Sequence, residues 1–169
     1  MNHNTVLIID DEEKLRSLLV KLISFEGYEV SEASDLKSGY KKLEMNTPAV
    51  VLCDVKLPDG NGVEFVAKVK AKFPEIEIIL LTAYGNIPDG VQAIKNGAFD
   101  YIVKSDDNNK IIPLLSKAID KASLQFKIKD LQQKLTGGIT FESIIGKSDE
   151  IKQAITHDSP PKYENYIYH

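Results

Sequence analysis

The sequence predicts an α/β protein in which a parallel sheet is covered by helices on both faces. Short runs of β-branched and aliphatic residues alternate five times with segments of helical periodicity through residue 121. Such alternation is typical of βα units, whose strands are buried on both sides. Right-handed crossovers leave few arrangements, and we expect the flavodoxin-like (βα)5 doubly wound sheet with strand order 2-1-3-4-5 and an extended C-terminal helix.

Five apolar runs define the strands. The first reads TVLII, and the third reads AVVLC immediately before Asp54. Runs of this length with β-branched residues and no polar alternation are typical of strands buried in a parallel sheet. The expected strands cover residues 5–9, 28–33, 49–53, 76–81 and 99–103.

The first two helices follow from apolar residues at helical spacing. The first helix is expected to end before Gly27, because a helix C-terminus favours a residue that tolerates positive φ. Asp35 is expected to cap the start of the second helix. The apolar face of the first helix consists of Leu15, Leu18, Leu19, Leu22 and Ile23.

The later helices have equally local boundary signals. We expect the third to begin near Val63, the fourth to end at Asn96 and Gly97, and the fifth to begin near Asn109. The fifth continues to Thr136, and its apolar positions form two neighbouring stripes. These are Leu115, Ile119, Ala122 and Phe126 in one, and Leu124, Ile128, Leu131 and Leu135 in the other.

A stripe of this length exceeds what one small domain can cover. We therefore expect a compact domain over residues 1–121 and a helical linker over residues 122–138, whose far half pairs with a second copy of the chain. The repeat is short for an independently stable coiled coil.

Composition narrows the function classes. The hydrophobic content of 43% and charged content of 27% are ordinary for a globular protein, and a net charge of −4 provides no basic field for nucleic acid. The single cysteine, Cys53, excludes a disulfide framework. No apolar run is long enough for a membrane helix, so we expect a cytoplasmic protein without direct DNA binding.

Chemically useful side chains stand at the ends of four expected strands. Asp10 and Asp11 follow the first strand, Asp54 the third, Thr82 the fourth and Lys104 the fifth. Because the carboxyl ends of parallel strands meet at one edge, these groups should share one crevice beside the switch point of the sheet.

Three carboxylates in one crevice repel one another, by about 4 kcal/mol per pair at ~4 Å and an effective dielectric near 20. A hard divalent cation removes that cost, and Mg²⁺ binds through one or two carboxylates while keeping positions open. The set therefore predicts Mg²⁺-dependent phosphoryl chemistry, with Asp54 as the nucleophile and with Lys104 and Thr82 binding the phosphoryl oxygens.

These residues resemble the receiver domain of two-component response regulators. The matching motifs are IIDDEEKL, CDVKLPDGNG, TAYG and GAFDYIVK. The resemblance implies that Asp54 accepts phosphate from a phosphohistidine on a sensor histidine kinase, and that the protein is a switch and not an enzyme in its own right. It implies a Mg²⁺ site made of Asp10, Asp11, Asp54 and the Lys56 backbone carbonyl, and a switch pair formed by Thr82 and Tyr101. The family has proline after the lysine, where this chain has Ser105.

The tail adds a second resemblance. The segment 141-FESIIGKSDEIKQAI-155 is similar to the opening of the ATPase domain in sigma-54-dependent transcriptional activators of the nitrogen-regulatory class. Residues 139–169 are accordingly expected to be the truncated start of that domain or a disordered tail. A dimer, with the ATPase domain of the parent protein as a further partner, is the implied assembly.

Three alternatives remain open. A phosphatase with an aspartyl-phosphate intermediate usually has a second acid two residues after the nucleophile, where this chain has Lys56. A phosphate-independent interaction module is compatible with Ser105. A flavin carrier on the same fold lacks its phosphate loop after the first strand, where acids stand instead.

Overall fold

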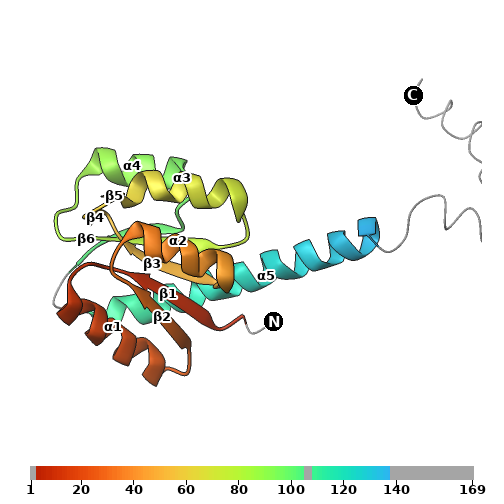
Figure 1. Ribbon diagram of the computed structural model, residues 1–169, viewed down its shortest axis with the longest axis horizontal. Coiled ribbons are helices and arrows are strands. Elements are labelled where there is room, and N and C mark those ends of the chain that lie inside the picture. Colours follow the sequence, from red (N-terminus) through yellow and green to blue (C-terminus); the bar gives the residue numbers. More distant parts are fainter. Residues whose placement is uncertain (1–2, 105–107, 138–169) are drawn as a thin grey trace, which may run out of the picture. The chain divides into compact units, whose positions relative to one another are not determined.

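The computed structural model describes residues 3–104 and 108–137, and it contains the expected doubly wound sheet (Figure 1). Five parallel strands lie in the order β2-β1-β3-β6-β7. They are β1 (Thr5–Ile9), β2 (Glu29–Ala33), β3 (Val50–Asp54), β6 (Glu77–Thr82) and β7 (Asp100–Val103). This is the expected order 2-1-3-4-5, and the expected bounds agree to within one residue.

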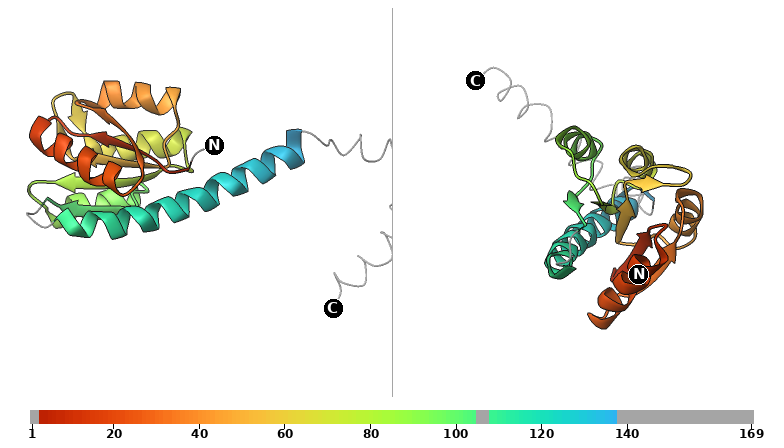
Figure 2. Two further views of the ribbon diagram at one scale, coloured as in Figure 1. Left: turned by 90° about the horizontal axis from the view of Figure 1, so that it is seen from below. Right: turned by 90° about the vertical axis from the view of Figure 1, so that its left-hand side faces the viewer.

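Helices cover both faces of the sheet, as Figures 1 and 2 show. Those on one face are α1 (Glu13–Phe25) and the first part of α5 (Ile111–Gly137); those on the other are α2 (Leu36–Met45), α3 (Gly62–Lys72) and α4 (Ile87–Lys95). A short 3-10 turn, η1 (Asn108–Lys110), precedes α5. The strands β1, β3 and β6 are almost entirely buried, which explains their continuous apolar sequence.

The local boundary signals are confirmed where the structure describes them. The Asp35 carboxylate accepts a hydrogen bond of 2.7 Å from the backbone N–H of Ser38 and so caps α2. Gly27 and Gly97 follow α1 and α4 with φ of 93° and 106°, a conformation that favours glycine.

The expected face of α1 is partly wrong. Leu19 and Ile23 are fully buried against the sheet, whereas Leu18 is 49% exposed. The helix lies on the sheet along a narrow stripe, and Leu18 is turned too far from its centre to be covered.

The structure also contains a small hairpin that was not expected from the sequence. Strands β4 (Lys56–Leu57) and β5 (Gly60–Asn61) pair antiparallel directly after β3. Strands of two residues have no detectable period, so the segment carries only the turn signal of Pro58 and the glycines.

The two stripes of α5 have different environments. Leu115, Ile119, Ala122 and Phe126 are buried in the core of the sheet domain. Leu124, Ile128, Leu131 and Leu135 are 48–69% exposed. Only the second stripe is therefore free to contact a second chain. The first compact unit extends to Phe126, five residues beyond the expected end at residue 121.

Several expectations concern residues outside the described part of the chain. They are the identity of the tail over residues 139–169, the last residue of the linker at Gly138 and the role of Ser105. In residues 3–104 and 108–137, no helix combines the length and apolar character needed to cross a bilayer.

Candidate functional site

Four strands deliver their terminal side chains to the carboxyl edge of the sheet. β1 and β3 are neighbours, and Asp10 directly follows β1 while Asp54 is the last residue of β3. Thr82 ends β6, and Lys104 directly follows β7. The connections leave β1 and β3 in opposite directions across the sheet, so their ends flank the crevice at the switch point.

The three expected acids meet in this crevice. One carboxylate oxygen from each of Asp10, Asp11 and Asp54 lies within 4.8 Å of the other two. Asp10 is fully buried, Asp54 is 7% exposed and Asp11 is exposed. An all-oxygen donor set with one solvent-facing member fits a hard divalent cation better than a thiophilic one.

Lys104 joins the two buried acids. Its Nζ lies 2.9 Å from Oδ2 of Asp10 and 3.0 Å from Oδ2 of Asp54. Its backbone N–H donates to the Thr82 carbonyl oxygen at 2.7 Å, which fixes the start of the lysine side chain against β6. Burial lowers the pKa of Lys104, but its hydrogen bonds to Asp10 and Asp54 outweigh this effect and leave the pKa above its usual value. The ammonium is therefore charged at neutral pH.

Burial raises the pKa of the Asp54 carboxyl group above its ordinary value. The hydrogen bond and charge of Lys104 act in the opposite direction, and the charge of Asp10 adds to the rise. An acid whose pKa is raised on folding stabilises the fold below its unfolded pKa, and this contribution is lost as the pH rises through the folded value. At neutral pH the metal-free Asp54 carboxylate is thus a net cost to stability.

We therefore expect Asp54→Asn to increase the free energy of unfolding at pH 7 by about 1 kcal/mol without metal, because Lys104 keeps its partner Asp10. The gain should shrink as the pH falls toward about 4, because the carboxyl group then begins to be protonated in the unfolded chain as well as in the folded one. Urea unfolding of both proteins between pH 4 and pH 8 in chelator measures the difference. A gain that is independent of pH would contradict this assignment of its cause.

The two expected switch residues lie on neighbouring strands, with Thr82 at the end of β6 and Tyr101 in β7. The Thr82 hydroxyl donates to the Tyr84 carbonyl oxygen at 3.1 Å, so it makes a local bond in the loop after β6. The Tyr101 hydroxyl is buried and has no hydrogen-bond partner among residues 3–104 and 108–137. An added Cβ at Gly90 would lie 3.2 Å from the Tyr101 ring, which shows how closely the ring approaches α4. The ring therefore packs against α4, and its expected inward turn on switching stays a prediction.

One supporting residue was missed from the sequence. Arg16, the only arginine of the chain, donates from Nη1 to the Asp10 carbonyl oxygen at 2.7 Å. Its Nε forms an ion pair of 3.2 Å with Glu32 of β2. The guanidinium group therefore holds the backbone that carries the acidic pair. Arg16 lies six residues after Asp10. This spacing predicts the contact only when the direction of α1 relative to β1 is known.

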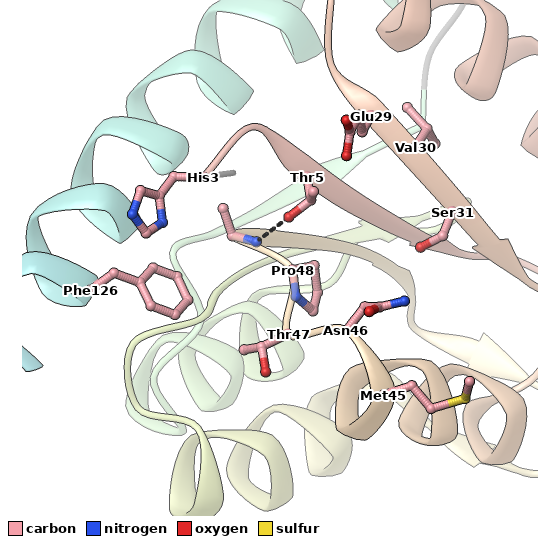
Figure 3. A pocket seen from close by; sticks show the side chains of 11 residues that line it. His3, Thr5, Glu29, Val30, Ser31, Met45, Asn46, Thr47, Pro48 and Phe126 are labelled. Atoms are coloured by element: carbon pink, nitrogen blue, oxygen red, sulfur yellow. Dashed lines mark hydrogen bonds between the residues drawn. The ribbon is translucent and has the colours of Figure 1, made fainter. Parts of the chain in front are cut away.

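A hollow of about 530 Å³ lies at the opposite edge of the sheet, where β1, β2 and β3 begin (Figure 3). His3 and Phe126 form one wall, with their rings stacked 5.1 Å apart. The hydroxyl oxygen of Thr5, the first residue of β1, accepts a hydrogen bond of 3.3 Å from the backbone N–H of Ala49. None of the expected phosphoacceptor, metal or switch residues lines this hollow, although Phe126 of the first α5 stripe does.

The profile of the response regulator receiver domain matches residues 6–129. The chain is 34% identical over 139 residues to the putative response regulator NtrX-like of Rickettsia typhi, covering 80% of this chain and 29% of that protein. It is 29% identical to the regulatory protein AtoC of Escherichia coli, covering 79% of this chain and 29% of AtoC. The chain thus spans less than a third of the length of these relatives.

Solved structures give the same result. The beryllofluoride-activated NtrC4 receiver domain dimer is similar with a TM-score of 0.67 and 31% identity, covering 70% of this chain and 98% of that one. The crystal structure of NtrX from Brucella abortus in complex with ATP is similar with a TM-score of 0.68 and 29% identity, covering 75% of this chain and 29% of that one.

Proposed function

Because the chain belongs to the response regulator receiver domain family, we propose that it accepts a phosphoryl group on Asp54 from a phosphohistidine of a sensor histidine kinase. The observation that carries this proposal is the position of Lys104. Its ammonium group bridges two buried carboxylates, Asp10 and Asp54, at 2.9 and 3.0 Å. A buried aspartate beside a fixed cation, at the edge of a parallel sheet, is suited to receive an anionic group.

In the transfer, a carboxylate oxygen of Asp54 forms a bond to phosphorus. The bond from phosphorus to the histidine nitrogen breaks, and the nitrogen keeps the electron pair and takes up a proton. Lys104 can neutralise a phosphoryl oxygen because its Nζ is already within hydrogen-bond distance of the attacking carboxylate. The Thr82 hydroxyl is the second candidate donor, and reaching the phosphoryl group requires it to leave the Tyr84 carbonyl.

We further propose that Asp10, Asp11, Asp54 and the backbone carbonyl of Lys56 hold Mg²⁺. The fit rests on the three carboxylate oxygens within 4.8 Å and on the exposure of Asp11, which leaves one side open to solvent. Bound Mg²⁺ supplies positive charge to the phosphoryl oxygens.

The downstream role is an extension of this proposal. The matched relatives include a nitrogen assimilation regulatory protein and a C4-dicarboxylate transport transcriptional regulatory protein, and the chain covers about a third of each. We propose that phosphorylation, read through Thr82 and Tyr101, changes the contacts of a homodimer that controls an activator ATPase in the parent protein. The second chain would cover the exposed stripe of Leu124, Ile128, Leu131 and Leu135.

Mass spectrometry after incubation with acetyl phosphate and Mg²⁺ tests the phosphoryl transfer. The wild type should gain one phosphoryl group on Asp54, and omission of Mg²⁺ should slow the gain by at least about tenfold. Asp54→Asn should remain unmodified, whereas Asp89→Asn, which removes a half-buried acid from the first turn of α4, should behave like the wild type. Equal modification of wild type and Asp54→Asn would refute the proposal and favour a phosphate-independent interaction module.

A further inference from the structure

The hairpin β4–β5 is too small to hold its own conformation. Each strand has two residues, and the connecting turn consists of Pro58 and Asp59. An isolated two-stranded hairpin is marginal in water even when it is longer. Yet this segment follows Asp54 directly and contains Lys56, so its position decides what stands beside the acidic cluster. Some contact outside the hairpin has to fix it.

Asp59 makes that contact at the tip of the hairpin. Its Oδ1 accepts the backbone N–H of Leu36 and its Oδ2 accepts the backbone N–H of Lys37, both at 2.9 Å. These are the first two residues of α2, so the carboxylate also faces the positive end of the helix dipole. Because both carboxylate oxygens accept a hydrogen bond, the hairpin tip is restricted both in its distance from α2 and in its rotation relative to that helix.

Two further contacts complete the attachment. Gly60 lies so close to α2 that an added Cβ would be 2.9 Å from Cδ1 of Leu36. At the base of the hairpin, the backbone N–H of Gly62 donates to the Val55 carbonyl oxygen at 2.8 Å. The hairpin is therefore held at its base by β3 and at its tip by α2.

We propose that Asp59 is a positioning residue that holds the phosphoacceptor loop in place by binding the N-terminus of α2. The effect of this contact on Mg²⁺ binding rests on the function proposed above. The backbone N–H of Lys56 lies 3.4 Å from Oδ1 of Asp54, so movement of the hairpin displaces the backbone next to the phosphoacceptor. With the tip free, the Lys56 carbonyl becomes a poorly ordered ligand, and the cation loses affinity.

Asp59 could alternatively act only as a cap that stabilises α2, but another residue already caps this helix. Asp35 is the N-cap residue, and its carboxylate accepts the Ser38 N–H at 2.7 Å within the same helix. The two aspartates thus bind the same helix end from different sides. Asp35 acts inside α2, whereas Asp59 connects α2 to the hairpin. Asp59 lies 23 residues after Leu36 and 22 residues after Lys37.

Backbone amide hydrogen exchange of the metal-free protein tests the attachment directly. Asp59→Ala should accelerate exchange at Leu36, Lys37 and Gly62 by about tenfold or more, because the tip contact is lost. Asp35→Ala is the matched control, since it removes a cap of the same helix without touching the hairpin. It should accelerate exchange at Ser38 and leave Gly62 unchanged. If Asp59→Ala leaves the Gly62 amide as protected as in the wild type, the inference is wrong.

Calorimetric titration with MgCl₂ then tests the consequence for the site. Asp59→Ala should bind Mg²⁺ about tenfold more weakly than the wild type, and Asp35→Ala should bind within about twofold of it. Equal affinity of Asp59→Ala and wild type overturns the positioning role. A wild type that binds no Mg²⁺ contradicts the proposed function instead, and in that case the exchange data alone decide whether Asp59 fixes the loop.

Discussion

Replacing Gly62 by alanine is expected to lower the free energy of unfolding by about 3 kcal/mol or more. An added Cβ would lie 2.4 Å from the Asp54 carbonyl oxygen and 3.1 Å from Cα of Val55. Both are backbone atoms at the end of β3, so no side chain can rotate away to relieve the overlap. The overlap can be relieved only by shifting the start of α3 or the strand end that carries the phosphoacceptor. Urea unfolding monitored by far-UV circular dichroism measures the loss.

Gly60→Ala is the matched control for this prediction. It adds the same methyl group two residues earlier, but among the described residues beyond its chain neighbours the new Cβ meets only Cδ1 of Leu36, at the end of a flexible side chain. We expect a loss below about 1 kcal/mol, within the usual range for a relieved contact. If both variants unfold at the same urea concentration, the close approach of Gly62 to β3 does not limit the stability of the domain.

The sheet was predictable because its signals are local and repeated. Each central strand is buried on both faces, so its sequence is a continuous apolar run that stands out from the helices on either side. Local signals also predicted the glycines after α1 and α4 and the capping role of Asp35, because each depends on a few neighbouring residues. The gathering of Asp10, Asp54 and Lys104 then followed from topology alone, since parallel strands end at one edge.

The missed features all depend on distant parts of the chain. The roles of Arg16 and Asp59 are set by contacts to β2 and to α2, which no spacing in the sequence reveals. Leu18 has the composition of a core residue but lies outside the narrow contact between α1 and the sheet. The two stripes of α5 look alike in sequence, and only the position of the domain separates the buried Phe126 from the exposed Leu124.

Lys104 balances the charge of the crevice when no metal is bound. Replacing it by methionine leaves Asp10, which is fully buried, and Asp54 without their ammonium partner. Removing one partner of a buried ion pair is costly because the other charge stays desolvated. We therefore expect Lys104→Met to lower the free energy of unfolding by about 3 kcal/mol at pH 7 in chelator. Chemical denaturation is the measurement, with the exposed Lys21→Met as the control that should stay within about 0.5 kcal/mol of wild type.

Two changes of condition should reduce this loss, and together they identify its cause. Without Lys104 the pKa of Asp54 rises further, since the hydrogen bond and charge of the lysine oppose that rise in the wild type. The free energy of unfolding of Lys104→Met then falls relative to wild type as the pH rises. The difference between the two proteins should therefore become smaller when the pH is lowered from 7 toward about 4. Added Mg²⁺ should also narrow the deficit at pH 7, because a cation among Asp10, Asp11 and Asp54 replaces the missing positive charge. A deficit that responds to neither acid nor Mg²⁺ would mean that Lys104 acts through the packing of its aliphatic chain, and that charge balance does not govern this crevice.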